Sequence, residues 1–408
     1  MEIYLVGGAV RDAMLGRTVT ERDWVVVGAH PDDLESQGYQ RVGREFPVFL
    51  HPKTHEEYAL ARLERKTRPG YRGFDTEFSP SVTLEDDLKR RDLTINAMAQ
   101  DAHGTLIDPY GGVRDLNSRI LRHVSPAFAE DPVRILRIAR FAARYAPLGF
   151  TVALETQQLM RAMVDSGEVN ALVAERVWVE TAKALAEPSP RMFFEVLRDC
   201  GALAVIFPEL AQLDGIPQPE RWHPEIDTGL HVRMVLDAAA QLSSSARVRF
   251  AALTHDLGKG TTPPAEWPKH VGHEARGALL IEQLVDRLRI PNDYRELALL
   301  VARHHGVCHR ALELRPGTLL ELLEQCDAFR RPERFVEFLL ACEADMRGRL
   351  GFEERPYPQA TLCHATLAAA RAVTLSDQER AGLDGLGIGH LIKTKRIAAI
   401  ATITTVSI

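Results

Sequence analysis

The sequence predicts an α+β fold in which a head with a small mixed sheet is followed by mostly helical domains. Short apolar runs typical of strands, such as IYLVGG, DWVVVG, FPVFLH and EYALAR, alternate with turns and helical patches within residues 1–110. Beyond about residue 128 these runs fade, and DPVRILRIARFAARYA and ERVWVETAKALAE carry apolar residues at helical spacing. The two signals therefore occupy different parts of the chain.

Size and composition limit the class of protein. A chain of 408 residues with 45% hydrophobic content is long enough for two or three globular domains. No run approaches about 18 apolar residues, and the start MEIYLVGG has an acid where a secretory signal carries positive charge, so we expect a cytoplasmic protein without a membrane span. The five cysteines form no CxxC pair and indicate reduced thiols, and the net charge of −6 does not indicate nucleic-acid binding.

Changes in composition predict four parts. The proline-rich stretch 208–229 marks a boundary, and the helical segment after it is unusually rich in histidine. We expect a catalytic head over 1–127, a helical neck and body over 128–222, a histidine-rich helical domain over 223–332 and a helical tail over 333–408. The last residues, TITTVSI, do not fit the pattern of the rest.

A glycine pair ends the first predicted strand. Gly7 and Gly8 precede a helix that is expected to start near Val10, and Arg11 follows at once. Glycine lets backbone N–H groups approach an anion closely, and a helix N-terminus adds a favourable field. By itself such a pair is typical of a structural turn.

Two acids at the start of the second predicted strand indicate what the glycine pair could bind. Glu21 and Asp23 are two residues apart, so strand alternation places both side chains on one face. Adjacent carboxylates repel each other unless a cation lies between them, and oxygen ligands favour Mg²⁺, which commonly bridges carboxylates and nucleotide phosphates. The glycines, Arg11 and the acids together predict a nucleotide site whose metal activates a hydroxyl and supports a leaving pyrophosphate.

A ridge of charged residues and a cluster of histidines carry further chemistry. Asp131, Arg134, Arg137 and Arg140 recur every three residues on a predicted helix, and an Asp–Arg pair offers hydrogen-bond acceptors and fixed donors that suit the edge of a base. The later segment LTHDLGKG sets a histidine beside an aspartate, which suits a divalent metal that activates water when other histidines join it. The residues in question are His255 and Asp256, with His231, His273, His304 and His305.

These motifs resemble a known family. GGAVRD (7–12) followed by ERD (21–23) resembles the signature of polymerase-β-type nucleotidyltransferases, in the branch of bacterial tRNA nucleotidyltransferases and poly(A) polymerases. RRDLTINAM (90–98) resembles the ribose-and-phosphate helix of that branch, and EDPVRILRIARFAAR (130–144) its nucleotide-selecting helix. The resemblance covers nearly the whole chain, includes an HD phosphohydrolase domain in the histidine-rich part, and weakens after about residue 355.

The resemblance implies roles for single residues in the head. Glu21 and Asp23 would be catalytic Mg²⁺ ligands, and Asp131 and Arg134 would act as a protein template that selects CTP or ATP. The other nucleotide-binding residues would be Gly8, Arg11 and Arg91 at the phosphates, Asp92 and Asn96 at the ribose, and Arg137 and Arg140 at phosphates or base. The basic loop 61–74 is either solvated or a mobile loop that shifts the pocket between cytidine and adenosine.

One position departs from the family pattern. The family usually has aspartate at the first acid position, where this chain has Glu21. The extra methylene moves the carboxylate by about 1.5 Å, the length of one carbon–carbon bond. We therefore expect altered geometry or rate, with Asp23 as the safer ligand.

In the HD domain the resemblance implies that His255 and Asp256 are the central ligands. His231 would join them, and His273 and His305 are less certain. Imidazole ligands admit Ni²⁺ or another divalent transition metal more readily than an all-oxygen site does, with Mg²⁺ as a further option. Relatives with this domain are metal-dependent phosphatases and 2′,3′-cyclic phosphodiesterases, and a degenerate domain is the alternative.

The sequence thus predicts a nucleotidyltransferase that builds or repairs the 3′-CCA end of tRNA from CTP and ATP without a template, with a second phosphohydrolase activity. The expected partners are tRNA and the two nucleotides, with no membrane, and the chain is expected to be a monomer or homodimer. Three alternatives stay open: a poly(A) polymerase, a protein uridylyltransferase, and an RNA-binding protein with inactive sites.

Overall fold

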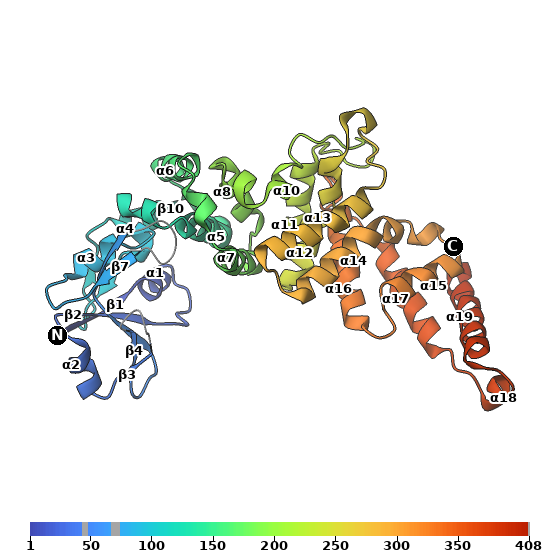
Figure 1. Cartoon of the computed structure of the whole chain (residues 1–408), viewed down its shortest axis with the longest axis horizontal. Coiled ribbons are helices and arrows are strands. Elements are labelled where there is room, and N and C mark those ends of the chain that lie inside the picture. Colours follow the sequence, from blue (N-terminus) through green and yellow to red (C-terminus); the bar gives the residue numbers. More distant parts are fainter. Residues whose placement is uncertain (43–47, 67–73, 407–408) are drawn as a thin grey trace. The chain divides into compact units, whose positions relative to one another are not determined.

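The computed structural model describes residues 1–42, 48–66 and 74–406 and contains two compact units, Met1–Ile206 and Phe207–Ile408. All named strands of the described residues lie in the first unit, and the second is helical (Figure 1). The predicted α+β class is confirmed. The predicted division into four parts stays a prediction.

The first unit is built on a seven-stranded sheet with the strand order β3-β4-β5-β2-β1-β8-β9. Central β2 pairs antiparallel with β1 and parallel with β5, so the sheet is mixed, as expected. In this register Asp23 lies opposite Val6, directly before the glycine pair. The strands are β1 (Glu2–Val6), β2 (Asp23–Val27), β3 (Gln40–Arg41), β4 (Val48–Leu50), β5 (Glu57–Leu60), β8 (Ala99–Gln100) and β9 (Leu106–Ile107).

Two small strand pairs and nine helices complete the described part of this unit. The ribbon of β6 (Leu63–Lys66) and β7 (Phe74–Glu77) flanks residues 67–73, so the middle of the predicted basic loop 61–74 lies outside the described residues. The other pair is β10 (Ile120–Leu121) with β11 (Thr151–Val152). The helices are α1 (Gly8–Met14), α2 (Pro31–Ser36), α3 (Leu84–Lys89), α4 (Gly112–Asn117), α5 (Val133–Tyr145), α6 (Leu154–Asp165), α7 (Ala174–Ala186), α8 (Arg191–Asp199) and α9 (Ala202–Ile206).

The apolar spacing of α5 explains its central place. Most of its residues are buried, and it packs against both α7 and α8, as expected for a helix that is apolar around most of its circumference. Arg134 and Arg140 are among its buried residues. These arginines must find partners inside the fold, because an unpaired buried charge is costly.

Two predicted helices differ from the observed ones. Helix α1 begins at Gly8 and not near Val10. The expected helix over RRDLTINAM is wrong, because α3 ends at Lys89 and only a 3₁₀ turn, η1 (Thr94–Asn96), follows before β8. Competing hydrogen bonds explain the break: the Thr94 N–H donates to the Arg122 carbonyl at 2.9 Å, and the Leu93 N–H donates to Asp92 Oδ1 at 2.8 Å.

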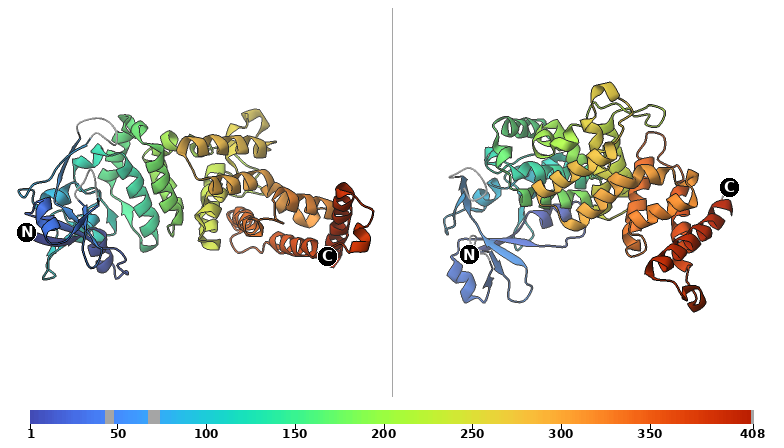
Figure 2. Two further views of the ribbon diagram at one scale, coloured as in Figure 1. Left: turned by 60° about the horizontal axis from the view of Figure 1, so that its bottom comes forward. Right: turned by 45° about the vertical axis from the view of Figure 1, so that its right-hand side comes forward.

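The second unit is a bundle in which α12 packs on α14 and α11 packs on α16. The sequence ending that fits no pattern is helical to Val406 in α19, which in Figure 2, in dark red, lies against the orange helices α15 and α17. The helices are α10 (Pro208–Ala211), α11 (Thr228–Leu242), α12 (Ala246–Thr254), α13 (His273–Leu288), α14 (Asn292–His309), α15 (Pro316–Gln325), α16 (Pro332–Arg347), α17 (Pro358–Ala372), α18 (Asp377–Arg380) and α19 (Gly385–Val406). Among the described helices of the chain, none combines the length and the apolar character that crossing a bilayer requires.

Candidate functional sites

A cavity of about 790 Å³ in the first unit brings the predicted head residues together. All the predicted site residues of the head line it, although they come from four separate stretches of sequence. They are Gly8, Arg11, Glu21, Asp23, Arg91, Asp92, Asn96, Asp131, Arg134, Arg137 and Arg140. The cavity also has walls that the sequence did not suggest: Arg90, Phe141, Arg144, Arg176 and Lys183.

The acid pair reaches this cavity from the edge of the sheet. Asp23 is the first residue of β2, and Glu21 lies two residues before it. Partial burial raises the pKa of Asp23; the charge of Arg91 opposes this rise, and the charge of Glu21 adds to it. A cation between the carboxylates would relieve both the burial and the repulsion, so the donor set fits a hard divalent ion such as Mg²⁺.

The glycine turn allows close approach of a basic side chain. Gly7 has a φ of 69°, and its N–H donates to the Met98 carbonyl at 3.2 Å. A Cβ atom at Gly7 would lie 2.8 Å from an Nη atom of Arg91, which is closer than such atoms approach. Glycine is therefore required here both by the backbone and by the arginine.

The side chain of Arg11 is held inside the site by contacts with two aromatic rings and two polar side chains. Its guanidinium lies 5.3 Å from the ring centre of Phe141 and 5.4 Å from that of Tyr145, and its Nε and an Nη each donate to Asp12 at 3.0 Å. The other Nη donates to Asn96 Oδ1. Arg11 borders the cavity, as predicted, and also fixes which way the Asn96 amide faces.

The hydrogen-bond chain continues from Asn96 to Asp92. Asn96 Nδ2 donates to Asp92 Oδ1 at 3.0 Å, and Arg137 Nε donates to Asp92 Oδ2 at 2.7 Å. Burial opposes ionisation of Asp92, but Arg137 and the bond from Asn96 outweigh it and lower its pKa to about 2. Asp92 is therefore a fixed, ionised acceptor at the wall of the cavity.

The predicted base-reading pair is engaged with the protein. Asp131 lies just before α5, off the helical ridge, and Arg176 of α7 grips its two carboxylate oxygens at 3.1 and 2.8 Å. Arg134 donates to the carbonyls of Ala127 and Arg90, each at 2.7 Å. Both side chains are thereby held in place before any ligand arrives.

Arg140 and Arg176 show what sequence reasoning missed. Arg140 is buried and donates to Glu180 at 2.6 Å, and Glu180 lies one helical turn after Arg176 on α7. We expected Arg140 at a phosphate or base, and the structure places it at the cavity with its charge already paired. The available signal was the polar stripe of Arg176, Glu180 and Lys183 on a helix that the sequence analysis treated only as packing.

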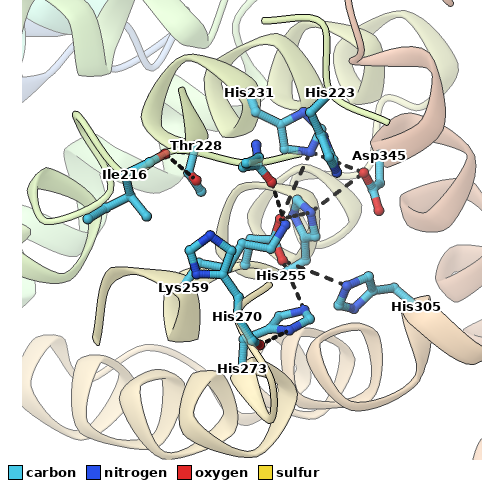
Figure 3. A network of polar contacts seen from close by, with 12 residues as sticks. Ile216, His223, Thr228, His231, His255, Lys259, His270, His273, His305 and Asp345 are labelled. Carbon is cyan, nitrogen blue, oxygen red and sulfur yellow. Dashed lines mark hydrogen bonds and ion pairs between the residues drawn. The ribbon is translucent and has the colours of Figure 1, made fainter. Parts of the chain in front are cut away.

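The second unit contains a buried histidine–aspartate cluster (Figure 3). Its members come from five helices or their ends and include all the predicted ligands. They are His231 on α11, His255 and Asp256 directly after α12, His273 at the start of α13, His305 on α14 and Asp345 on α16.

One group of ligand atoms surrounds His255. Its Nε2 lies 3.1 Å from Asp256 Oδ2 and 3.7 Å from Asp345 Oδ1. His231 Nε2 lies 3.1 Å from Asp345 Oδ1 and 4.0 Å from Asp256 Oδ2. Two imidazoles and two carboxylates thus lie close together around His255, a donor set that suits a divalent transition metal.

A second group shares Asp256 with the first. Asp256 Oδ1 lies 3.4 Å from His273 Nε2 and 3.7 Å from His305 Nε2. Among the described residues, His255 Nε2, His273 Nε2 and Asp256 Oδ1 are buried without a hydrogen-bond partner. Buried polar atoms are normally satisfied, so these orphaned atoms fit the ligands of a cation and place His273 and His305 beside the central ligands.

Hydrogen bonds on the outer side orient these imidazoles. In three of the histidines Nδ1 is bonded to a backbone carbonyl, which fixes the tautomer and leaves Nε2 as a lone-pair donor directed inward. The bonds run from His255 to Ala252 at 2.7 Å, from His273 to His270 at 3.0 Å and from His305 to Val301 at 2.9 Å. The cluster is thus arranged for ligation before a metal arrives.

The charges of the cluster support this arrangement. Burial disfavours the carboxylate form of Asp345, yet the neighbouring charges, His255 first, hold its pKa well below the usual range. Burial, and then the charge of His255, lower the pKa of His305 to about 3. At neutral pH Asp345 is therefore ionised and His305 is neutral, which are the forms that bind metal.

Asp345 was not predicted as a ligand. It lies beyond residue 332, where we placed the end of the histidine-rich domain, in a helix that reads as ordinary packing. The missed signal is its position: Asp345 continues the apolar spacing of Phe335, Phe338 and Cys342 and is only 2% exposed. An acid on the apolar stripe of a helix is rarely buried without a partner.

Three known families match the sequence. The family described as Poly A polymerase head domain matches residues 3–122. The family described as Probable RNA and SrmB- binding site of polymerase A matches residues 149–213. The HD domain family matches residues 228–336.

Whole proteins and solved structures agree with these matches. The chain is 64% identical over 400 residues to the Multifunctional CCA protein of Thioalkalivibrio sulfidiphilus, with 98% of each chain covered. A CCA-adding enzyme solved with CTP matches with a TM-score of 0.66 at 20% identity, covering 98% of this chain and 87% of that one. The Thermotoga maritima CCA-adding enzyme solved with tRNA matches with a TM-score of 0.63 at 18% identity, covering 100% and 92%. At these identities the two structures show a shared fold.

Proposed function

This chain belongs to the family of multifunctional CCA proteins, and we propose that its head adds the terminal C, C and A to the 3′ end of tRNA, using CTP and ATP. The single observation that carries the proposal is the head cavity. Residues predicted as metal ligands, phosphate and ribose contacts and base readers all line one space of nucleotide size.

The chain's own residues account for most of the proposed reaction. The glycine turn admits the triphosphate beside Arg91, while Asp92 and Asn96 fix the sugar. When bound, the Mg²⁺ held by Asp23 and Glu21 would lower the pKa of the attacking 3′-hydroxyl and neutralise charge on the departing pyrophosphate. The Asp131–Arg134 pair would present acceptors and donors to the base edge, so no nucleic-acid template is needed.

For the second unit we propose a metal-dependent phosphohydrolase that acts on phosphates or 2′,3′-cyclic phosphates at RNA 3′ ends. The support is the set of inward-facing Nε2 atoms and the orphaned atoms of the cluster. The bound ion, Ni²⁺ or another divalent transition metal, would activate water. His231, His255, Asp256 and Asp345 would hold it, and His273 and His305 would complete the site.

Incubating the full chain with tRNA that lacks CCA and with labelled CTP and ATP tests the head proposal. Addition of three nucleotides and then a stop is the expected result. Continuous addition of A would identify a poly(A) polymerase, and labelling of protein by UTP a uridylyltransferase. No incorporation would leave an RNA-binding protein.

Glu21→Asp tests the departure from the family pattern. We expect incorporation to be retained or raised, because a shorter carboxylate restores the usual geometry of the acid pair. The measurement is kcat for CMP incorporation over a titration of Mg²⁺. A collapse of activity would show that position 21 is not a simple metal ligand.

Arg176→Ala tests whether the two hydrogen bonds from Arg176 hold Asp131 in its working position. We expect kcat/KM for CTP and for ATP to fall by about tenfold or more, because a hydrogen bond to a charged group contributes about 1.5–3 kcal/mol. Misincorporation of UMP should rise, since a loose carboxylate no longer presents fixed acceptors. Arg191→Ala is the matched control, because that arginine pairs with Glu195 of its own helix and does not line the cavity. An unchanged UMP to CMP ratio in Arg176→Ala would contradict this role.

A further inference from the structure

The loop between α10 and α11, residues 214–227, is the wall of the histidine–aspartate cluster that none of the assigned roles uses. It is well anchored: the Gln218 N–H donates to the Ile226 carbonyl at 2.8 Å, and the Leu350 N–H donates to Glu225 Oε2 at 3.2 Å. A defined surface of fixed shape therefore borders the cluster, although the segment has no helix or strand.

Side chains on the inner side of the 214–227 loop contact the cluster directly. The rings of His223 and His231 meet edge to face with their centres 4.6 Å apart, as Figure 3 shows, and Glu225 Oε1 lies 2.8 Å from His231 Nδ1. The loop thus supports a predicted ligand from behind.

One inner side chain is left with an unused donor. Gln218 is 2% exposed, and its Oε1 accepts a hydrogen bond from Lys259, whose Nζ lies 2.6 Å from Asp256 Oδ2. The Nε2 of the same amide is buried without a partner among the described residues. A buried donor of this kind, beside a lysine and a metal-binding aspartate, suits an anionic oxygen.

The 214–227 loop also carries an exposed aromatic side chain, Trp222. Trp222 is 54% exposed, and the guanidinium carbon of Arg221 lies 4.8 Å from its ring centre. Exposed single aromatic residues are common, but this one directly precedes His223, and adjacent Cα atoms are about 3.8 Å apart. The backbone of Trp222 thus adjoins the residue whose ring contacts His231, and the indole has a cation beside it.

We propose that the 214–227 loop binds the last nucleotide of a single-stranded RNA 3′ end, with its base stacked on Trp222 and its terminal phosphate beside Gln218 and Lys259. Aromatic rings stack any base, and neighbouring cations offset the charge of the backbone. This inference rests on the proposed phosphohydrolase function and adds a specificity determinant to it: recognition of the base of the last nucleotide, which phosphate esters without a base lack.

The test compares two substrates in the full chain: a short RNA that ends in a 2′-phosphate, and the same RNA whose last nucleotide lacks its base. Trp222→Ala should lower kcat/KM for the intact RNA by about tenfold, the effect of losing one stacked base. Hydrolysis of the abasic RNA should be unchanged. Trp222→Phe should restore most of the loss, and Leu386→Ala, which removes another exposed apolar side chain of the same unit, should have no effect.

The possible outcomes distinguish a failure of the loop proposal from a failure of the phosphohydrolase proposal. An equal loss on both RNAs, or no loss on either, overturns the stacking role. If the wild-type chain hydrolyses neither RNA, the phosphohydrolase proposal fails, and calorimetric binding of the same two RNAs then decides about the loop. Tighter binding of the intact RNA that disappears in Trp222→Ala would support the loop, and equal binding by both proteins would overturn it.

Discussion

Asp23→Asn is expected to lower CMP and AMP incorporation by about a thousandfold, because a metal ion at such a site stabilises transition-state charge by several kcal/mol and each 1.36 kcal/mol is a factor of ten. The substitution keeps the size of the side chain and removes one anionic ligand. Asp23 is central because it is fixed by the register of β2, opposite Val6, while Glu21 lies before the strand. The loss should therefore appear in kcat, with CTP still bound.

The control for Asp23→Asn is Asp32→Asn. Asp32 is an exposed carboxylate in the first turn of α2, in the same unit, and does not line the cavity. It should retain wild-type incorporation. If Asp23→Asn remained folded and lost less than about tenfold in kcat, the acid pair would not hold the catalytic metal, and the proposed function of the head would lose its basis.

The grouping of the candidate head residues around one cavity could be predicted from the sequence because its signals are local. The acid pair and the glycine turn lie within some twenty residues, and both Glu21 and Asp23 line the cavity, although β2 begins only at Asp23 and strand alternation does not cover Glu21. The ridge on α5 was equally accessible, since Arg134, Arg137 and Arg140 follow the helical period. On the ridge a short-range rule determines the direction of the side chains.

The side chains that hold these residues in place could not be predicted from the sequence, because their positions depend on tertiary contacts. Arg176 meets Asp131 only because α7 packs on α5, and no spacing rule joins two positions on separate helices. The break after Lys89 was missed for a related reason: RRDLTINAM has acceptable helix formers, but the tertiary bond from Thr94 to Arg122, together with the local bond from Leu93 to Asp92, overrides that propensity.

The two sites share one physical strategy. In the head, Asn96 and Asp92 are oriented by Arg11 and Arg137. In the second unit the imidazoles are oriented by backbone carbonyls. In both, groups that would contact a ligand are fixed beforehand by hydrogen bonds on their far side, which reduces the reorganisation needed at the moment of reaction. Sequence motifs indicate the candidate contacting residues, and only the fold reveals what orients them.

His255→Ala is expected to abolish phosphohydrolase activity, with a loss of at least about a hundredfold, because even the residues that support metal ligands typically contribute 10- to 100-fold. His255 lies within 3.7 Å of both carboxylates of the first ligand group, so its loss should also lower the amount of metal bound. The measurements are hydrolysis of RNA ending in a 2′,3′-cyclic phosphate and the metal content of the purified protein. CCA addition by the same variant should stay within about twofold of wild type, as expected for independent sites.

His304→Ala provides the matched control. His304 neighbours His305 on α14 but belongs to none of the metal-candidate groups among the described residues, so its removal should leave hydrolysis and metal content unchanged. An equal loss of hydrolysis in His304→Ala would show that hydrolysis falls even when no candidate ligand is removed, and the His255→Ala result would then not identify a ligand. If His255→Ala kept its metal and its hydrolysis, the histidine–aspartate cluster would be a relict. If a well-folded His255→Ala lost CCA addition as strongly as hydrolysis, two independent sites would be the wrong description of this chain.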